Sequence, residues 1–337
     1  MITKIMNECV VTRKAPLNLQ KRDLYLFERE LIITLPPVFI IANENVIVIN
    51  GNTVIDNKNK LIPGYAQINS YPVKKLEKIK LLLKKWFYKK YIIDNSCFWI
   101  TDAWSLGYFH WLSDALPRLI CLKNESNKFN VLLPEFYKEL KYVISSLNLL
   151  GFDPVFFDPL RPLYVKKLIT CTNIAPSGNY NPSLLKKIKE ILIANITIPS
   201  KPFPSKNIYI SRSKAFHRKV LNEDDVIQCL TNYGFKTIIS EDLTFEEQVI
   251  LFNNSKNVVS IHGAGLSNCL FMKPKSNILE LRMEGDSHSN CYYSMADANN
   301  VNYYYLGCDT DSDNTFDGNI RVDINRLQKT IKLMLNV

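Results

Sequence analysis

Apolar and polar positions alternate in short runs along this chain, and the clearest pattern lies in its C-terminal half. Runs of strand length at 207–211, 257–261 and 277–282 are separated by stretches with the period of amphipathic helices. Further strands are predicted at 235–240 and 301–306. This alternation predicts parallel strands joined by helices, with helices on both faces of the sheet. The chain is therefore of the α/β class, and ligands are expected at the carboxyl ends of its strands.

The N-terminal half is less regular and begins rich in β-structure. Its first seventy residues predict strands at 31–35, 38–41 and 46–49, separated by turn signals that include Asn43–Asn45. Beyond them the pattern predicts strands at 97–100, 131–134 and 163–172, and helices at 108–119, 137–149 and 182–194. Gly151 is a suitable residue to end the second of these helices.

Two domains suit a chain of 337 residues, and a proline-rich stretch marks the boundary between them. Three prolines at 197–205 resist both helix and sheet. We predict an N-terminal lobe over 1–196, a linker at 197–206, a C-terminal lobe over 207–318 and a C-terminal helical segment over 319–337. In the C-terminal lobe, Asn222 is expected to cap one helix, and Thr244 with Glu247 a second through a capping box.

The net charge of +10 favours anionic partners such as nucleic acid, an anionic membrane or a phosphorylated ligand. Much of the excess lies in a predicted helix near 74–91 that mixes lysines with leucines and aromatics. That helix could lie on an anionic membrane surface, or it could pack on the core and expose a solvated lysine face. No recognition motif for nucleic acid accompanies the charge.

Other classes of protein are disfavoured by what the sequence lacks. No apolar run approaches the roughly 18 residues that a membrane span needs, and the N-terminus has no signal-peptide apolar region. The expected location is therefore the cytosol. The eight cysteines have no paired spacing, which argues against disulfides and structural zinc and favours small core residues.

The most informative segment is the turn that follows the predicted strand 257–261. A β-branched apolar run ends there in a glycine-containing bend that leads to another apolar stretch, a pattern that presents backbone N–H groups to a phosphate or nucleotide. Glycine would let a ligand approach the backbone, although such turns often serve geometry alone. The candidate binding residues of this turn are His262, Gly263, Ala264, Gly265, Leu266 and Asn268.

Two arginines follow the first strand of the same lobe. Ser211 ends that strand, and Arg212 and Arg218 come directly after it. A guanidinium is always charged and matches phosphate oxygens in a bidentate way. These residues are therefore candidates to face the same phosphate, with surface arginines as the alternative. Glu280 ends a neighbouring strand and could accept from ribose hydroxyls, or form an ion pair instead.

Acid–base chemistry has one clear candidate in the N-terminal half. His110 and Asp114 stand four residues apart, so both lie on one helix face among apolar neighbours. Such a pair could act as a general base, or it could be a satisfied structural histidine. The acidic run 309–313 contains a DxD sequence, but a solvated turn explains it better than a calcium loop, whose other ligands are missing.

Three motifs together resemble glycosyltransferase family 61, and most closely its bacterial members linked to capsular polysaccharide synthesis. They are the segment 108–119 with His110 and Asp114, the segment Ile210-Ser211-Arg212 with Arg218, and the segment 262–268. The similarity covers roughly residues 95 to 285. It implies a GT-B architecture, in which two Rossmann-like lobes face each other across a cleft and the C-terminal helix packs back on the first lobe.

The resemblance also implies an activity and a role for each motif. The C-terminal lobe would hold a nucleotide-sugar donor, usually a UDP-sugar, and transfer would invert the anomeric carbon without a metal or other cofactor. Arg212 and Arg218 would hold the diphosphate, and Asp114 or His110 would face a glycan or glycolipid acceptor. The implied setting is surface polysaccharide synthesis by a cytosolic enzyme at the inner face of the cytoplasmic membrane. The alternative is a non-catalytic nucleotide- or glycan-binding protein on the same fold.

Overall fold

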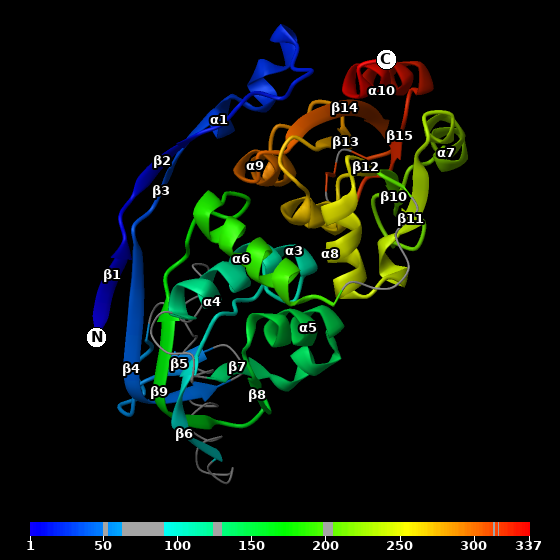
Figure 1. Cartoon of the computed structure of the whole chain (residues 1–337). Helices are drawn as coiled ribbons and strands as arrows, with labels where there is room; N and C mark the ends of the chain where they lie inside the picture. Colours follow the sequence, from blue (N-terminus) through cyan, green and yellow to red (C-terminus); the bar gives the residue numbers. More distant parts are fainter. Residues whose placement is uncertain (50–52, 63–90, 124–129, 198–204, 313, 316) are drawn as a thin grey trace. The chain divides into compact units, whose positions relative to one another are not determined.

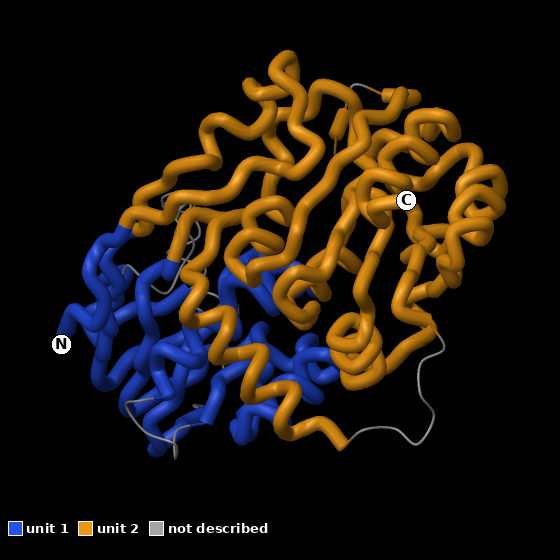
Figure 2. The backbone as a smooth tube through the Cα atoms, turned by 45° about the horizontal axis from the view of Figure 1, so that its top comes forward, with its two compact units in different colours: residues 1–9, 36–174 blue, residues 10–35, 175–337 orange. Residues whose placement is uncertain are grey.

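The computed structural model is a mixed α/β protein and describes residues 1–49, 53–62, 91–123, 130–197, 205–312, 314–315 and 317–337 (Figure 1). It forms two compact units (Figure 2). The first consists of residues 1–9 and 36–174, and the second of residues 10–35 and 175–337. The predicted basic helix up to residue 90 and most of the predicted linker lie outside the described residues.

The first unit is built on a mixed sheet with the strand order β1-β4-β9-β6-β7-β8, and β5 pairs with β4. Strands β9, β6, β7 and β8 are parallel neighbours, whereas β4 is antiparallel to β1, β5 and β9. The strands are β1 (Ile2–Met6), β4 (Val38–Ile49), β5 (Thr53–Ile55), β6 (Tyr91–Phe98), β7 (Asn130–Pro134), β8 (Pro154–Phe157) and β9 (Leu163–Cys171). The helices are α3 (Tyr108–His110), α4 (Leu116–Lys123) and α5 (Lys141–Leu150).

The prediction of a turn at Asn43–Asn45 is wrong, because β4 is one continuous strand. It pairs with β9 on both sides of Asn45, which has a left-handed φ of 54° and is skipped in the register. Asparagine tolerates that conformation better than most residues, so pairing with β9 carries the strand through a polar stretch. The predicted end of α5 is confirmed, since Gly151 has a φ of 78° and caps the helix.

The second unit is a doubly wound sheet with the strand order β11-β10-β12-β13-β14-β15. The first five strands are parallel, and β15 is antiparallel to β14. The strands are β10 (Asn207–Ser211), β11 (Lys236–Ile239), β12 (Asn257–Ile261), β13 (Asn277–Met283), β14 (Asn302–Thr310) and β15 (Ile320–Arg321). The helices are α6 (Pro182–Asn195), α7 (Glu223–Thr231), α8 (Phe245–Asn254), α9 (Cys291–Ala298) and α10 (Ile324–Leu335).

This strand order creates a topological switch point. The chain builds the sheet outward from β10 to β11, then returns to the other side of β10 and continues through β12, β13 and β14. The connections that leave the carboxyl ends of β10 and β12 therefore diverge, and open α/β sheets bind ligands in the crevice between such loops. The two predicted phosphate-binding segments follow these two strands.

Helix α10 packs on the parallel sheet of the second unit. Its buried residues Leu327, Ile331 and Met334 join a core cluster with Leu279 and Tyr304 of the parallel strands. Alternate strand residues face this cluster because side chains alternate across a strand. The sheet thus already gives the amphipathic helix a partner within the second unit.

Residues 10–35 also belong to the second unit, although the predicted N-terminal lobe includes them. This N-terminal arm contains β2 (Cys9–Thr12), α1 (Glu28–Leu31) and β3 (Ile32–Leu35), of which β2 and β3 form a separate two-stranded sheet. The side-chain amide of Asn18 donates to the backbone carbonyl of Tyr305 on β14 at 2.6 Å and accepts from the backbone N–H of the same residue at 3.1 Å. Phe27 is fully buried against the tyrosines of β14 and α9. Contacts so distant along the chain leave no local pattern.

The capping predictions have mixed outcomes. Thr244 and Glu247 form the complete capping box at the start of α8. Asn222 precedes α7 but does not cap it with its side chain. That amide instead bonds both backbone groups of Val322, at 3.0 Å each, and so links the start of α7 to the strand end before α10.

The cysteines are free and six of the eight are buried, as expected for core residues. In the described part of the chain, no helix has the length and apolar character needed to cross a membrane.

Candidate active site

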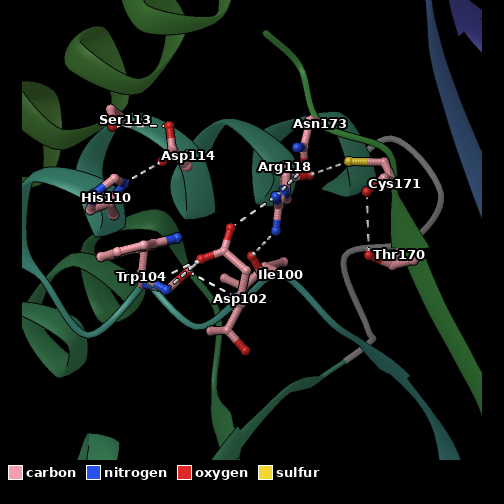
Figure 3. Close-up of polar contacts among 12 residues, drawn as sticks. Ile100, Asp102, Trp104, His110, Ser113, Asp114, Arg118, Thr170, Cys171 and Asn173 are labelled. Carbon is pink, nitrogen blue, oxygen red and sulfur yellow. Dashed lines mark hydrogen bonds and ion pairs between the residues drawn. The ribbon is translucent and has the colours of Figure 1, made fainter. Parts of the chain in front are cut away.

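His110 and Asp114 are in direct contact in the first unit, as their spacing predicts. Nδ1 of His110 lies 2.7 Å from Oδ2 of Asp114, and we call this pair the dyad (Figure 3). The backbone between them is a π-helical turn, Trp111–Ala115, inserted between α3 and α4. Such turns widen a helix locally and are frequent at functional sites. The sequence predicted an ordinary helix here, because nothing local distinguishes a π turn from an α turn.

The dyad is partly shielded from solvent and its carboxylate has a second hydrogen-bond partner. Its side chains are 24% and 19% exposed, so both are partly shielded yet reachable. The other carboxylate oxygen of Asp114 accepts from the hydroxyl of Ser113 at 3.1 Å. A carboxylate fixed by a histidine and a hydroxyl fits a general base, and a histidine in this contact can share the proton.

A buried ion pair near the dyad escaped the sequence-based prediction. Arg118 on α4 donates to Oδ2 of Asp102 at 3.1 Å, to the carbonyl of Ile100 at 3.1 Å, and to the side chain of Asn173 (Figure 3). The carboxylate of Asp102 in turn accepts from the backbone N–H of Trp104 at 3.0 Å. A signal was present in the sequence, since an arginine inside an apolar helical run must find a partner when it is buried.

In the second unit, the structure brings the arginine segment and the glycine turn together at the switch point. Arg212 follows β10 and Gly263 follows β12, and a Cβ placed on Gly263 would lie only 2.8 Å from Cζ of Arg212. Any side chain at position 263 would therefore displace the guanidinium. We call this packing the arginine–glycine contact. The predicted proximity of these two segments is confirmed.

The loop after β10 fixes the direction of the Arg212 guanidinium. Its Nε donates to the carbonyl of Arg218 at 3.2 Å, and a terminal nitrogen donates to the carbonyl of His217 at 3.2 Å. Arg218 has a left-handed φ of 57°, which closes this loop. Ser211 is buried, and its hydroxyl accepts from the backbone N–H of Ser213 at 3.1 Å.

The electrostatics of these arginines favour an anion. Burial and the neighbouring charge of Arg218 lower the pKa of Arg212. Among the described residues, Nε of Arg218 is buried and has no hydrogen-bond partner. A partly buried guanidinium that is disfavoured by burial and by a neighbouring positive charge gains from a negative ligand such as a phosphate.

Glu280 is turned inward and forms an ion pair, which is the alternative that the sequence left open beside a ribose contact. Its side chain is 0% exposed, and its two oxygens are bonded to Nδ1 of His262 and to the hydroxyl of Tyr303, the latter at 2.6 Å. Burial alone would raise the pKa of Glu280, but the charges and hydrogen bonds of His262, Arg282 and Tyr303 lower it on balance. Glu280 is an ionised anchor that orients His262 at the end of β12.

The other predicted residues of the turn divide into two groups. Ala264 and Gly265 are half-buried, whereas Leu266 and Asn268 are buried within the 3-10 helix Ala264–Phe271. The amide of Asn268 donates to Gln248 at 2.9 Å and to the carbonyl of Gly265 at 3.2 Å. Leu266 and Asn268 are therefore buried residues that stabilise the turn. Tyr292 was not predicted, and its ring lies 4.8 Å from the ring of His262.

The acidic run 309–313 starts inside β14, whose last two residues are Asp309 and Thr310, so the prediction of a turn does not hold for them. The carboxylate of Asp311 accepts from the backbone and side-chain nitrogens of Asn319, at 2.7 and 2.8 Å. Residue 313 lies outside the described residues. Within the described residues, no cluster of three or more histidines, cysteines or acidic groups could hold a metal ion.

A comparison with known proteins finds one family model whose matched sequence includes both clusters of residues. The family model of glycosyltransferase 61 matches residues 108–279, just over half of the chain, from the dyad to the glycine turn. A relative, the EGF domain-specific O-linked N-acetylglucosamine transferase of Drosophila melanogaster, is 32% identical over 151 residues. The matched region covers 43% of this chain and 28% of the relative, so the chain spans under a third of the relative's length. With these motifs in place, the chain belongs to glycosyltransferase family 61.

Proposed function

We propose that this protein is an inverting, metal-independent glycosyltransferase of GT-B architecture that transfers a sugar from a nucleoside diphosphate donor, most simply a UDP-sugar, to a hydroxyl group. The observation that carries the proposal is the arginine–glycine contact at the switch point of a doubly wound sheet. In this proposal the first unit supplies the dyad and the second unit supplies the arginine–glycine contact.

The proposed chemistry assigns one step to each cluster. Asp114 removes the proton of the acceptor hydroxyl, and His110 orients the carboxylate of Asp114. The variants in the Discussion distinguish this assignment from the reverse one, in which His110 is the base. The acceptor oxygen then attacks the anomeric carbon from the face opposite the diphosphate. The bond to the diphosphate oxygen breaks, and its electron pair leaves with the nucleoside diphosphate. Arg212 and Arg218 stabilise the charge that develops on that leaving group.

The acceptor in this proposal is a glycan, free or linked to a lipid, as in surface polysaccharide synthesis at the cytosolic face of a membrane. The support is the resemblance of the three motifs to bacterial members of the family. The name of the insect relative includes O-linked transfer of N-acetylglucosamine, which makes an N-acetylglucosamine donor the first to test.

Donor binding tests the proposal directly. We expect Arg212→Ala to weaken UDP binding about 10- to 100-fold in calorimetry, because a charge-assisted hydrogen bond is typically worth about 1.5–3 kcal/mol. Gly263→Ala should have a similar effect with little loss of stability, since its methyl group would only push aside the flexible end of Arg212.

The matched control for these variants is Lys214→Ala. It removes one positive charge from the same loop, but this lysine is exposed and pairs with Asp242 on the surface. UDP affinity should then remain near that of the unmodified protein. An Arg212→Ala protein that binds UDP as tightly as the Lys214→Ala protein would contradict the phosphate role.

Removal of divalent metal is a second test. We expect turnover to persist after dialysis against EDTA, because two guanidinium groups can neutralise the departing diphosphate. The measurement is the transfer rate before dialysis, after it, and after Mn²⁺ is restored. A strict requirement for Mn²⁺ would contradict the proposal and direct attention to the acidic run 309–313.

A further inference from the structure

Trp104 is an exposed aromatic side chain beside the dyad. It lies on the loop 99–107, which connects β6 to α3, and it is 63% exposed. Trp99 and Trp111 bracket it in the sequence, and both are almost completely buried. An exposed indole of this kind has a face available for contact with a ligand.

The loop that carries Trp104 is held firmly from both ends. The carboxylate of Asp102 accepts from the backbone N–H groups of Trp104 and Ser105, at 3.0 and 3.1 Å, and the buried Arg118 holds that carboxylate. At the other end, the hydroxyl of Tyr142 on α5 donates to the carbonyl of Leu106. A buried charge pair is a costly way to hold a surface loop, and it gives the exposed indole a fixed backbone.

The indole lies beside the proposed base. Its ring is 5.7 Å from the ring of His110, centroid to centroid, with an angle of 34° between their planes (Figure 3). The partly exposed side chains of His110 and Asp114 thus provide hydrogen-bonding groups at the edge of an apolar aromatic face.

This combination matches the chemistry of a sugar ring. A pyranose presents C–H groups on one face, which suit the negative face of an indole, and hydroxyls around its rim, which need polar partners. We propose that Trp104 is the platform on which the sugar ring of the acceptor stacks, with one hydroxyl directed at the dyad. The inference deepens the proposed function by naming the acceptor site, and it rests on the dyad being the acceptor-side base.

Binding of simple sugars tests the platform without catalysis. The probes are methyl β-glycosides of glucose, galactose and N-acetylglucosamine, observed by saturation-transfer NMR with and without UDP. We expect at least one glycoside to receive saturation, strongest at its ring C–H protons, and Trp104→Ala to reduce the signal roughly tenfold. Trp104→Phe, which keeps an aromatic face, should retain most of it.

The matched control is Tyr91→Ala. Tyr91 is also an exposed aromatic residue, but it begins β6, whereas the loop with Trp104 follows the end of that strand. Its replacement should leave the signal unchanged. The proposal is overturned if no glycoside gives a signal that depends on Trp104, or if Trp104→Ala and Tyr91→Ala behave alike.

Kinetic measurements distinguish the role of Trp104 in acceptor binding from the role of Asp114 as the base. Trp104→Ala should raise the KM for the acceptor about tenfold and leave UDP affinity unchanged, whereas an unchanged acceptor KM would overturn the platform. Loss of the proposed mechanism would instead appear as full turnover in an Asp114→Asn protein. The NMR result with Trp104→Ala decides the platform independently of that outcome.

Discussion

Asp114→Asn is expected to lower kcat about 10²- to 10⁴-fold, the contribution of a positioned general base. The amide can still accept from His110 but cannot take the proton of an acceptor hydroxyl. UDP affinity should stay near normal, because the dyad and the arginine–glycine contact belong to different units. The measurements are the transfer rate at saturating substrates and UDP binding by calorimetry.

Two further variants make this result specific. Asp94→Asn removes an exposed carboxylate from β6 of the same unit and should leave kcat unchanged. His110→Gln should lower kcat less than Asp114→Asn if histidine only orients the base. A larger loss in His110→Gln would assign the base to the histidine, and full activity in Asp114→Asn would exclude the aspartate.

Phe27→Ala is expected to reduce the free energy of unfolding of the second unit by about 3–5 kcal/mol, the usual cost of removing a buried phenylalanine. The ring is 0% exposed and lies 5.2 Å from the ring of Tyr293 and 5.0 Å from that of Tyr305. The guanidinium of Arg282 lies over it at 5.3 Å, so the variant also removes a cation–π contact from a buried charge.

Denaturant unfolding followed by far-UV circular dichroism measures this effect. The control is Tyr25→Ala, which truncates an exposed aromatic residue of the same arm and should change stability by no more than about 0.5 kcal/mol. Equal stability of the two variants would mean that the arm does not complete the second unit. Phe27→Ala should also weaken UDP binding. Phe27 contacts Tyr303, which bonds Glu280, and Glu280 in turn bonds His262.

Local signals were sufficient for much of the fold. The strands and helices that were predicted after residue 205 lie close to their predicted positions, because hydrophobic periodicity and helix capping depend on neighbouring residues. Helix α9 and strand β15 were not predicted. The contact between His110 and Asp114 was predictable for the same reason, since a helical turn separates them. The proximity of Arg212 and Gly263 followed from the rule that parallel strands present their carboxyl ends on one edge.

Two polar residues take partners that their local sequence does not indicate. Glu280 has the character of a ribose acceptor in the sequence, but its partners His262 and Tyr303 lie 18 and 23 residues away and draw it into the interior. The amide of Asn222 bonds Val322, 100 residues away, instead of capping its helix. In each case a distant polar partner within the fold satisfied a group whose local role seemed clear.

The sequence by itself determined the α/β class, most of the strands and helices of the second unit and the contact between His110 and Asp114, because each depends on interactions between near neighbours. Tertiary structure alone decided the strand order that creates the switch point, the docking of the arm 10–35 on the second unit, and the place of Trp104 beside His110. These features depend on contacts between segments far apart in the chain, and such contacts form only when the whole core is buried.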